Sequence, residues 1–459
     1  MPLKDESRNI ELASPRASIN NDVFGEIPAE GPNYRDIGWM GTFVLMLKTQ
    51  VGLGVLSIPY AFDKLGLIPG ILCLLGVALI ATWGQRIVGV FKRNHADVYS
   101  IVDTGEKIGG RPGRELMGFA FMLYWICVAA SGMSGISTAL NAITLHGACT
   151  AIFVALAAFF AFAIGSIRTL GNISWLAWIG GLSIFAALFT LTVAVGLQGR
   201  PTEAPKIGPY VSNYKLIGNP TFYEGMAAIN SLVFAYSGTP AFFAIISEMR
   251  DPRQYKKAML TCQCTMTGIY LVVGIVVYYY CGTYVSSPAL GSAGPLLKRI
   301  CYGLALPGLM VSTCLLIHYP SKYIFVRALR DSQHLVSNST IHWITWLSCT
   351  FGVTIVGYVI ASTVPNFGSL VSLVGALLAT LMSFQPMGAM WLHDNWNRRE
   401  RGIQWRIGVS WSVFVIVIGT YIMIAGSYTA IVSIIDSYTS VSGTNPWSCA
   451  DKSNSVDLD

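Results

Sequence analysis

Apolar residues of this chain gather in long windows of about twenty residues, separated by short polar loops. Each window is long enough for a helix that crosses the hydrocarbon core of a bilayer. Spans are expected near residues 38–63, 67–91, 115–143, 149–166, 173–197, 223–247, 259–283, 302–326, 342–362, 366–391 and 408–435. The pattern therefore predicts an all-α polytopic membrane protein with about 11 transmembrane helices.

Polar residues dominate both ends of the chain. Residues 1–36 are mixed in charge and rich in Ser, Asn and Pro, so we expect a disordered cytoplasmic tail. They contain no signal-peptide core, and the first span is expected to direct membrane insertion. The membrane domain is expected over residues 37–435, and residues 436–459 are expected to form a short extracytoplasmic tail.

Two of the expected spans are interrupted by Gly and Pro. The first break lies within Lys48–Pro59 and the second within Phe234–Phe242. Backbone that is released from helical hydrogen bonds inside a membrane is costly unless it lines a cavity or meets a ligand. Two such breaks, about five spans apart, indicate discontinuous helices 1 and 6 around a binding site at mid-membrane.

Composition and charge agree with a membrane protein. Of the 459 residues, 53% are hydrophobic and 12% are charged, about half the charged share of a soluble domain. The net charge of +7 does not indicate a nucleic-acid partner, because Lys and Arg cluster at span ends. Alternate loops hold most of them: Lys92, Arg93, Lys107, Arg111, Arg114, Arg168, Arg250, Arg253, Lys256, Lys257, Lys322, Arg327, Arg330, Arg398, Arg399, Arg401 and Arg406. These loops are expected to be cytoplasmic, with the N-terminus inside and the C-terminus outside.

With this orientation, span 1 starts inside and span 6 starts outside. The two broken spans then open two five-span repeats of opposite orientation, about 38–197 and about 223–391. This is the five-plus-five arrangement of an inverted-repeat transporter, and the helix at about 408–435 is an addition to it. The repeat is inferred from span order and from the breaks, since the two halves show no obvious identity.

The 10 Cys residues are scattered, mostly inside apolar spans, which fits free thiols better than a disulfide framework. Cys149, Cys281, Cys301 and Cys449 are expected on one side of the membrane, where spacing does not decide pairing. No metal site and no cofactor are expected. A membrane enzyme is excluded as well, because clustered His, Asp, Glu or Cys residues within the spans are missing.

The first break offers groups for both ends of a zwitterion. The half-helix that ends near Gln50 exposes carbonyl groups beside Thr49, which suit an ammonium group. The half-helix that restarts near Val55 exposes N–H groups, which suit a carboxylate. Gly52 and Gly54 let a ligand approach the backbone. The alternative for a single Gly-x-Gly is close helix packing, but a matching second break disfavours it.

The break residues carry a specific resemblance. The run that contains Gly52, Gly54, Leu56, Ser57, Pro59, Tyr60, Ala61 and Phe62 resembles the first-span signature of the amino acid/auxin permease family. Phe234–Phe242, followed by Glu248, Met249 and Pro252, resembles the sixth-span signature. The resemblance covers about 38–435 and is nearest to fungal neutral amino acid permeases. It implies the five-plus-five, leucine-transporter-like inverted-repeat fold, alternating access and amino acid transport, usually with protons.

Lys48 lies deep in an expected span and beside the first break. An intramembrane ammonium is expensive, so its side chain is expected to be paired, snorkelling or functional. Lys48 either snorkels or makes a cytoplasmic gate contact, or its charge replaces a coupling cation or titrates during transport. Lysines at this place occur in proton-coupled proteins that the chain resembles.

Further polar groups are candidates for coupling or gating. Ser312 and Thr313 could offer hydroxyls to a cation held against the carbonyls of span 1, or could bond back to their own helix. Glu248 is expected to be a cytoplasmic gate group near Arg250 or Lys256.

The substrate side chain is expected to meet Tyr124 and the second break, which contributes Phe234, Tyr236, Ser237, Gly238 and Thr239. The family often has a basic or imidazole residue at the position of Thr239, so the preferred side chain stays open. The core offers no acid for a cationic substrate, which favours neutral amino acids.

The expected function is proton-coupled symport of neutral, aliphatic or aromatic amino acids by a monomer. The plasma membrane is the expected location. Sodium coupling, a vacuolar location and a nutrient-sensing transceptor are alternatives. A channel is disfavoured, since no repeated polar or charged rings are visible.

Overall fold

The computed structural model describes residues 19–21, 25–27, 37–168, 170–201, 204–205, 210–330, 332–335, 339–364, 367–397, 401–439, 447, 449–451 and 453. Apart from one antiparallel hairpin, β1 (Ile19–Asn21) with β2 (Gly25–Ile27), the described regular structure is helical. The hairpin falls within the tail that was expected to be disordered, most of which lies outside the described residues.

The first half of the membrane domain contains five expected spans. Its helices are α1 (Trp39–Gln50), η1 (Gly54–Ser57), α2 (Ile58–Leu65), α3 (Leu67–Asn94), α4 (Ile101–Thr144), α5 (Thr150–Gly165) and α6 (Leu170–Leu197). The positive φ of 62° at Gly110 marks a kink inside α4, which separates a short first segment from the membrane span.

The second half follows the same order and adds one helix. It contains α7 (Phe222–Ala235), η2 (Thr239–Ala241), α8 (Phe242–Ser247), η3 (Pro252–Gln254), α9 (Tyr255–Cys281), η4 (Gly282–Tyr284), η5 (Ala289–Ser292), α10 (Pro295–Ala328), η6 (Gln333–Leu335), α11 (Thr340–Thr363), α12 (Phe367–Leu373), the π-helical η7 (Val374–Ala379), α13 (Thr380–Ser383), α14 (Gln385–Asn395) and α15 (Ile403–Thr439).

Among the described residues, ten helical stretches are long and apolar enough to cross a membrane. The expected fourth span corresponds to α5, which has 16 residues and an estimated length of about 24 Å. This helix packs against α4, α10 and α11. With α5 included, the structure agrees with the expected set of about 11 helices.

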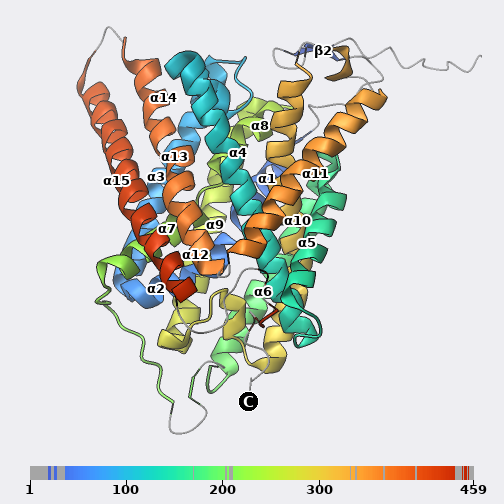
Figure 1. The fold of residues 1–459 in the computed structure, drawn as a ribbon. Coiled ribbons are helices and arrows are strands. Elements are labelled where there is room, and N and C mark those ends of the chain that lie inside the picture. Colours follow the sequence, from blue (N-terminus) through green and yellow to red (C-terminus); the bar gives the residue numbers. More distant parts are fainter. Residues whose placement is uncertain are drawn as a thin grey trace, which may run out of the picture.

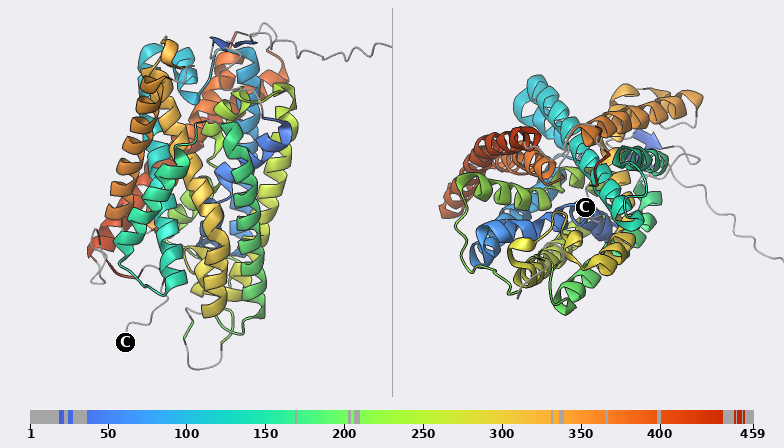
Figure 2. Two further views of the ribbon diagram at one scale, coloured as in Figure 1. Left: turned by 90° about the vertical axis from the view of Figure 1, so that its right-hand side faces the viewer. Right: turned by 60° about the horizontal axis from the view of Figure 1, so that its bottom comes forward.

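Helices α1 and α8, one half of each broken span, lie near the middle of the bundle (Figures 1 and 2). In the most apolar part of Trp39–Leu65, 83% of residues are buried, and in Phe222–Ser247 the share is 89%. The corresponding shares are 33% for α3 and 22% for Ile403–Asp436 at the edge of the bundle. The unwound segments are therefore enclosed by protein and shielded from lipid, as irregular backbone in a membrane requires.

A disulfide joins Cys149, before α5, to Cys449 in the C-terminal tail. Next to it, the Thr150 hydroxyl donates to the carbonyl of Ala450 over 2.7 Å. Cys281 and Cys301, which were expected on the same side, are free thiols. The tail is thus fastened to the end of the bundle where α5 begins.

Candidate functional site

The first broken helix unwinds where Gly interrupts its apolar run. Helix α1 ends at Gln50, as predicted, and Val51 takes an extended conformation with φ −83° and ψ 101°. A 3₁₀ turn fills Gly54–Ser57, so the α-helix restarts at Ile58, three residues later than the predicted Val55. Pro59 falls in the first turn of α2, where its missing N–H costs no helical bond.

The second broken helix has the same plan. Helix α7 ends at Ala235, and Tyr236, Ser237 and Gly238 form the irregular connection. The 3₁₀ turn Thr239–Ala241 contains Pro240 and leads directly into α8. Both predicted breaks are confirmed.

Reciprocal glycine contacts hold the two breaks against each other. A Cβ atom added to Gly54 would lie 2.6 Å from Cα of Ala235, at the end of α7. A Cβ atom on Gly238 would lie 2.5 Å from Cγ of Gln50, at the end of α1. Real Cβ atoms do not approach neighbours so closely, so any side chain at either glycine pushes the breaks apart.

Two buried tyrosines bond the carbonyl groups that the breaks release. The hydroxyl of Tyr270 on α9 lies 2.9 Å from the carbonyl oxygens of both Gln50 and Ala235 and can donate to either. The hydroxyl of Tyr124 on α4 lies 2.6 Å from the carbonyl oxygen of Ser237 and 2.8 Å from its Oγ. Tyr270 was not predicted. The available signal in the sequence was a tyrosine, with its polar hydroxyl, in the middle of the expected span 259–283.

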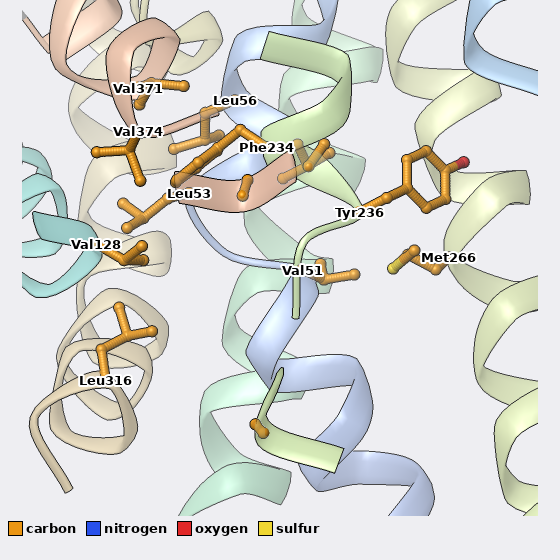
Figure 3. Packing of buried hydrophobic residues seen from close by; sticks show 14 of the residues in the cluster. Val51, Leu53, Leu56, Val128, Phe234, Tyr236, Met266, Leu316, Val371 and Val374 are labelled. Carbon is orange, nitrogen blue, oxygen red and sulfur yellow. The ribbon is translucent and has the colours of Figure 1, made fainter. Parts of the chain in front are cut away.

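A cavity lies where the breaks meet α4 and α10. The predicted residues that line it are Lys48, Thr49, Gln50, Gly52, Gly54, Tyr124, Phe234, Ser237 and Ser312. Leu53, Val128 and Leu316 also line it and were not predicted. Figure 3 shows Leu53, Phe234, Val128 and Leu316 beside the first break, on its α4 and α10 side. The cavity thus combines unwound backbone with an apolar wall.

Five predicted residues lie outside this lining: Tyr236, Gly238, Thr239, Thr313 and Glu248. Tyr236 points away from the cavity toward Met266 on α9 (Figure 3), and its hydroxyl lies 3.1 Å from Oγ1 of Thr267. Thr313 donates to the carbonyl of Leu309 on its own helix over 2.8 Å, which is the alternative that the sequence left open.

Lys48 does not snorkel. Its residue is 3% exposed, and its Nζ donates to the carbonyls of Gly308 on α10 over 3.1 Å and of Gly180 on α6 over 3.4 Å. Among the described residues, no carboxylate lies within salt-bridge distance of this Nζ. The side chain therefore joins the first break to α6 and α10 through neutral acceptors.

Glu248 has a different partner from the one expected. Its buried carboxylate pairs with Nζ of Lys322 on α10, instead of with Arg250 or Lys256. The expected pairing was wrong because Glu248 is buried, whereas Arg250 and Lys256 are exposed, and α10 brings Lys322 to its carboxylate inside the protein. The backbone carbonyl of Glu248 also accepts a hydrogen bond from the N–H of Ile37, 3.3 Å away. The end of α8 is therefore bonded to α10 and to the chain before α1.

Comparisons with known proteins agree with this architecture. The model of a family described as "Transmembrane amino acid transporter protein" matches residues 35–432. A "Transmembrane transporter" of Gibberella moniliformis is 32% identical over 437 residues, which cover 95% of this chain and 92% of that protein. The "N amino acid transport system protein" of Neurospora crassa is 30% identical over 420 residues, or 91% and 89% of the two chains.

Two solved structures share the fold at low sequence identity. MhsT in complex with L-phenylalanine has a TM-score of 0.54 and 15% identity, covering 87% of this chain and 97% of its own. A Na⁺-coupled sialic acid symporter has a TM-score of 0.56 and 13% identity, covering 87% and 91%. These similarities confirm the leucine-transporter-like fold that the resemblance implied.

Proposed function

Because the chain belongs to the transmembrane amino acid transporter family, we propose that it is a proton-coupled symporter of neutral amino acids. It is an integral, multi-pass membrane protein of a transporter family rather than an enzyme family. The symporter works by alternating access, in which one repeat moves against the other around a central site. The proposed repeats are 38–197 and 223–391, with 408–435 as an additional helix.

The observation that carries this proposal is the cavity at the two breaks. The backbone around Gly52 and Gly54 offers the α-carboxylate of an amino acid a helix start, and the carbonyl end of α1 faces its ammonium group. Leu53, Val128, Phe234 and Leu316 surround the place left for a side chain. No Asp or Glu belongs to the lining, so we propose an aliphatic or aromatic substrate. The relative from Neurospora crassa is named an amino acid transport protein, which supports an amino acid as the substrate.

Lys48 supports proton coupling rather than sodium coupling. Its ammonium group bonds the carbonyls of Gly180 and Gly308, and loss of its proton would weaken both bonds. A lysine can therefore supply, by titration, the charge that a bound cation supplies elsewhere. Sodium coupling is the second candidate, because Oγ of Ser312 is buried without a hydrogen-bond partner and lines the same cavity.

The disulfide supports the proposed orientation. Disulfides persist on the extracytoplasmic side, where the environment is oxidising. Three membrane spans lie between Trp39 and Cys149, so the two residues lie on opposite sides of the membrane. We therefore propose a cytoplasmic N-terminus and, from the resemblance to fungal permeases, a plasma-membrane location. The monomer is the proposed unit, since the cavity is built from a single chain.

Uptake in permease-deficient cells tests the function. Labelled leucine, phenylalanine and proline are supplied while external pH and sodium are varied independently. We expect saturable uptake that rises as external pH falls and that does not need sodium. Uptake that persists at all pH values but stops without sodium would establish the second candidate. Absence of counterflow by unlabelled substrate would instead indicate a channel, and nutrient signalling without uptake would indicate a transceptor.

A further inference from the structure

A cluster of metal-ligating side chains lies away from the cavity, where helices α3 and α14 end. It consists of His95, which follows α3, and of His393 and Asp394 in the last turn of α14. One ligand atom from each residue lies within 4.8 Å of the other two. Oδ1 of Asp394 stands 2.9 Å from Nε2 of His95 and 3.2 Å from Nδ1 of His393. Two imidazole nitrogens and one carboxylate oxygen thus converge from two helices.

The surroundings hold these groups in place. Asn94 donates its amide to Oδ2 of Asp394 over 2.9 Å, which orients the carboxylate. The ring of Phe91 lies 4.3 Å from that of His95 and 6.2 Å from that of His393, measured between centroids. His95 and Asp394 are half-buried, whereas His393 is exposed. The cluster therefore has an apolar floor, an oriented ligand and access from solvent, as bound metals require.

We propose that His95, His393 and Asp394 form a binding site for a divalent transition metal, with Zn²⁺ as the best match. Imidazole and carboxylate ligands suit Zn²⁺, and three protein ligands leave a fourth tetrahedral position for water. Zn–N and Zn–O distances of about 2 Å place neighbouring ligands roughly 3.3 Å apart, close to the separations already present around Asp394. Binding displaces the direct His–Asp contacts and puts the metal at their centre.

The site would fasten two parts of the bundle. Helix α3 belongs to the first proposed repeat, and α14 is the last helix of the second. If the repeats move as proposed for the transport cycle, metal that joins His95 to His393 slows their separation. This consequence rests on the proposed function, whereas the binding site does not.

Direct binding to the purified full-length protein tests the site. Co²⁺ is used as a visible probe and Zn²⁺ as its competitor, with calorimetry for affinity. We expect one Zn²⁺ per chain and a Co²⁺ absorption band typical of tetrahedral coordination. His95→Ala and His393→Ala should each weaken Zn²⁺ binding by about 100-fold or more, and Asn94→Ala by about 10-fold. Because His393 is exposed, its variant carries little risk of misfolding.

The matched control is His146→Ala, which removes a half-buried histidine that contacts Asn141 and lies outside the cluster. It should leave Zn²⁺ affinity unchanged. Absence of stoichiometric binding by the unmodified protein, or equal affinity in the His393→Ala and His146→Ala variants, would overturn the proposed site. In proteoliposomes, Zn²⁺ on the side of His95 should slow amino acid uptake, and His393→Ala should relieve this effect. Binding without an effect on uptake would refute only the fastening role.

Discussion

The two helix breaks have the same plan but serve the cavity unequally. Each ends an α-helix at a polar or small residue, each restarts through a 3₁₀ turn, and each has a glycine against the other. The first break supplies half of the lining, namely Lys48, Thr49, Gln50, Gly52, Leu53 and Gly54. The second supplies Phe234 and Ser237. Similar backbone geometry in an inverted repeat therefore does not imply similar chemical roles.

The second break contributes less to the cavity because its polar groups are hydrogen-bonded to other parts of the protein. In the second break, Oγ of Ser237 donates to the carbonyl of Phe234 over 2.6 Å, and the hydroxyl of Tyr124 bonds Ser237. The hydroxyl of Tyr236 bonds Thr267 outside the cavity. These groups hold the second break in shape. We infer that the first break binds the charged ends of the substrate, while the second break holds the first in position.

The largest effect is expected where the two breaks touch. Gly238→Leu should abolish uptake, because its Cβ atom would lie 3.2 Å from the carbonyl oxygen and 2.8 Å from Oγ1 of Thr49. Gly54→Leu should do the same through Ala235. Uptake and surface expression are measured together. Gly268→Leu on α9 is the matched control, since a Cβ atom there meets nothing within 4 Å. Normal uptake by the Gly238→Leu variant would show that the breaks do not need their close contact.

The next largest effect is expected from Lys48, the charged residue that the first break has and the second lacks. Lys48→Met should lower uptake strongly and flatten its dependence on external pH, because the only lysine in the cavity lining is lost. Lys48→Arg keeps a charge that is always present, so it should permit substrate binding but block a step that needs proton release. Initial rates of uptake and substrate binding are compared from pH 5 to pH 8. A pH profile that matches the unmodified protein in both variants would remove Lys48 from coupling.

A smaller effect is expected from the tyrosines that support the breaks. Tyr270→Phe removes a hydroxyl shared by the carbonyls of both breaks, and Tyr124→Phe removes one that bonds the second break alone. An unsatisfied buried carbonyl costs about 1–3 kcal/mol, so Tyr270→Phe should reduce uptake more than Tyr124→Phe. Tyr421→Phe, at an exposed position on α15, is the control. A larger loss of uptake in Tyr124→Phe than in Tyr270→Phe would contradict the supporting role assigned to the second break.

The breaks could be predicted because Gly and Pro stand out within apolar runs. Gly54 and Gly238 lie where the two breaks touch each other, and Gly52 faces Ser312 on α10. Their partners could not be predicted in the same way. The contact of Tyr270 with both breaks and the pairing of Glu248 with Lys322 depend on how α9 and α10 pack, which no local pattern encodes.

The same limit applies to long-range pairs and to helix restarts. Cys149 and Cys449 are 300 residues apart, so their spacing carried no information about pairing. The helix was expected to restart near Val55, where the structure has a 3₁₀ turn, and the sequence pattern did not show that the α-helix itself begins only at Ile58. Tyr236 was expected near substrate because aromatic residues beside a break have no periodicity to show which way they point.

The smallest effects are expected on α10, where neighbouring hydroxyls face different surroundings. Oγ of Ser312 lies in the cavity without a hydrogen-bond partner, and a Cβ atom on Gly52 would stand 2.9 Å from it. Thr313 already bonds its own helix. Ser312→Ala should therefore raise the KM for substrate several-fold, whereas Thr313→Val, which keeps the side-chain volume, should change it less than about twofold. An equal change in both variants would mean that the two hydroxyls act through helix packing and that Ser312 has no separate role at the cavity. A larger change in Ser312→Ala that appears only when sodium is present would instead place a cation between Ser312 and the first break.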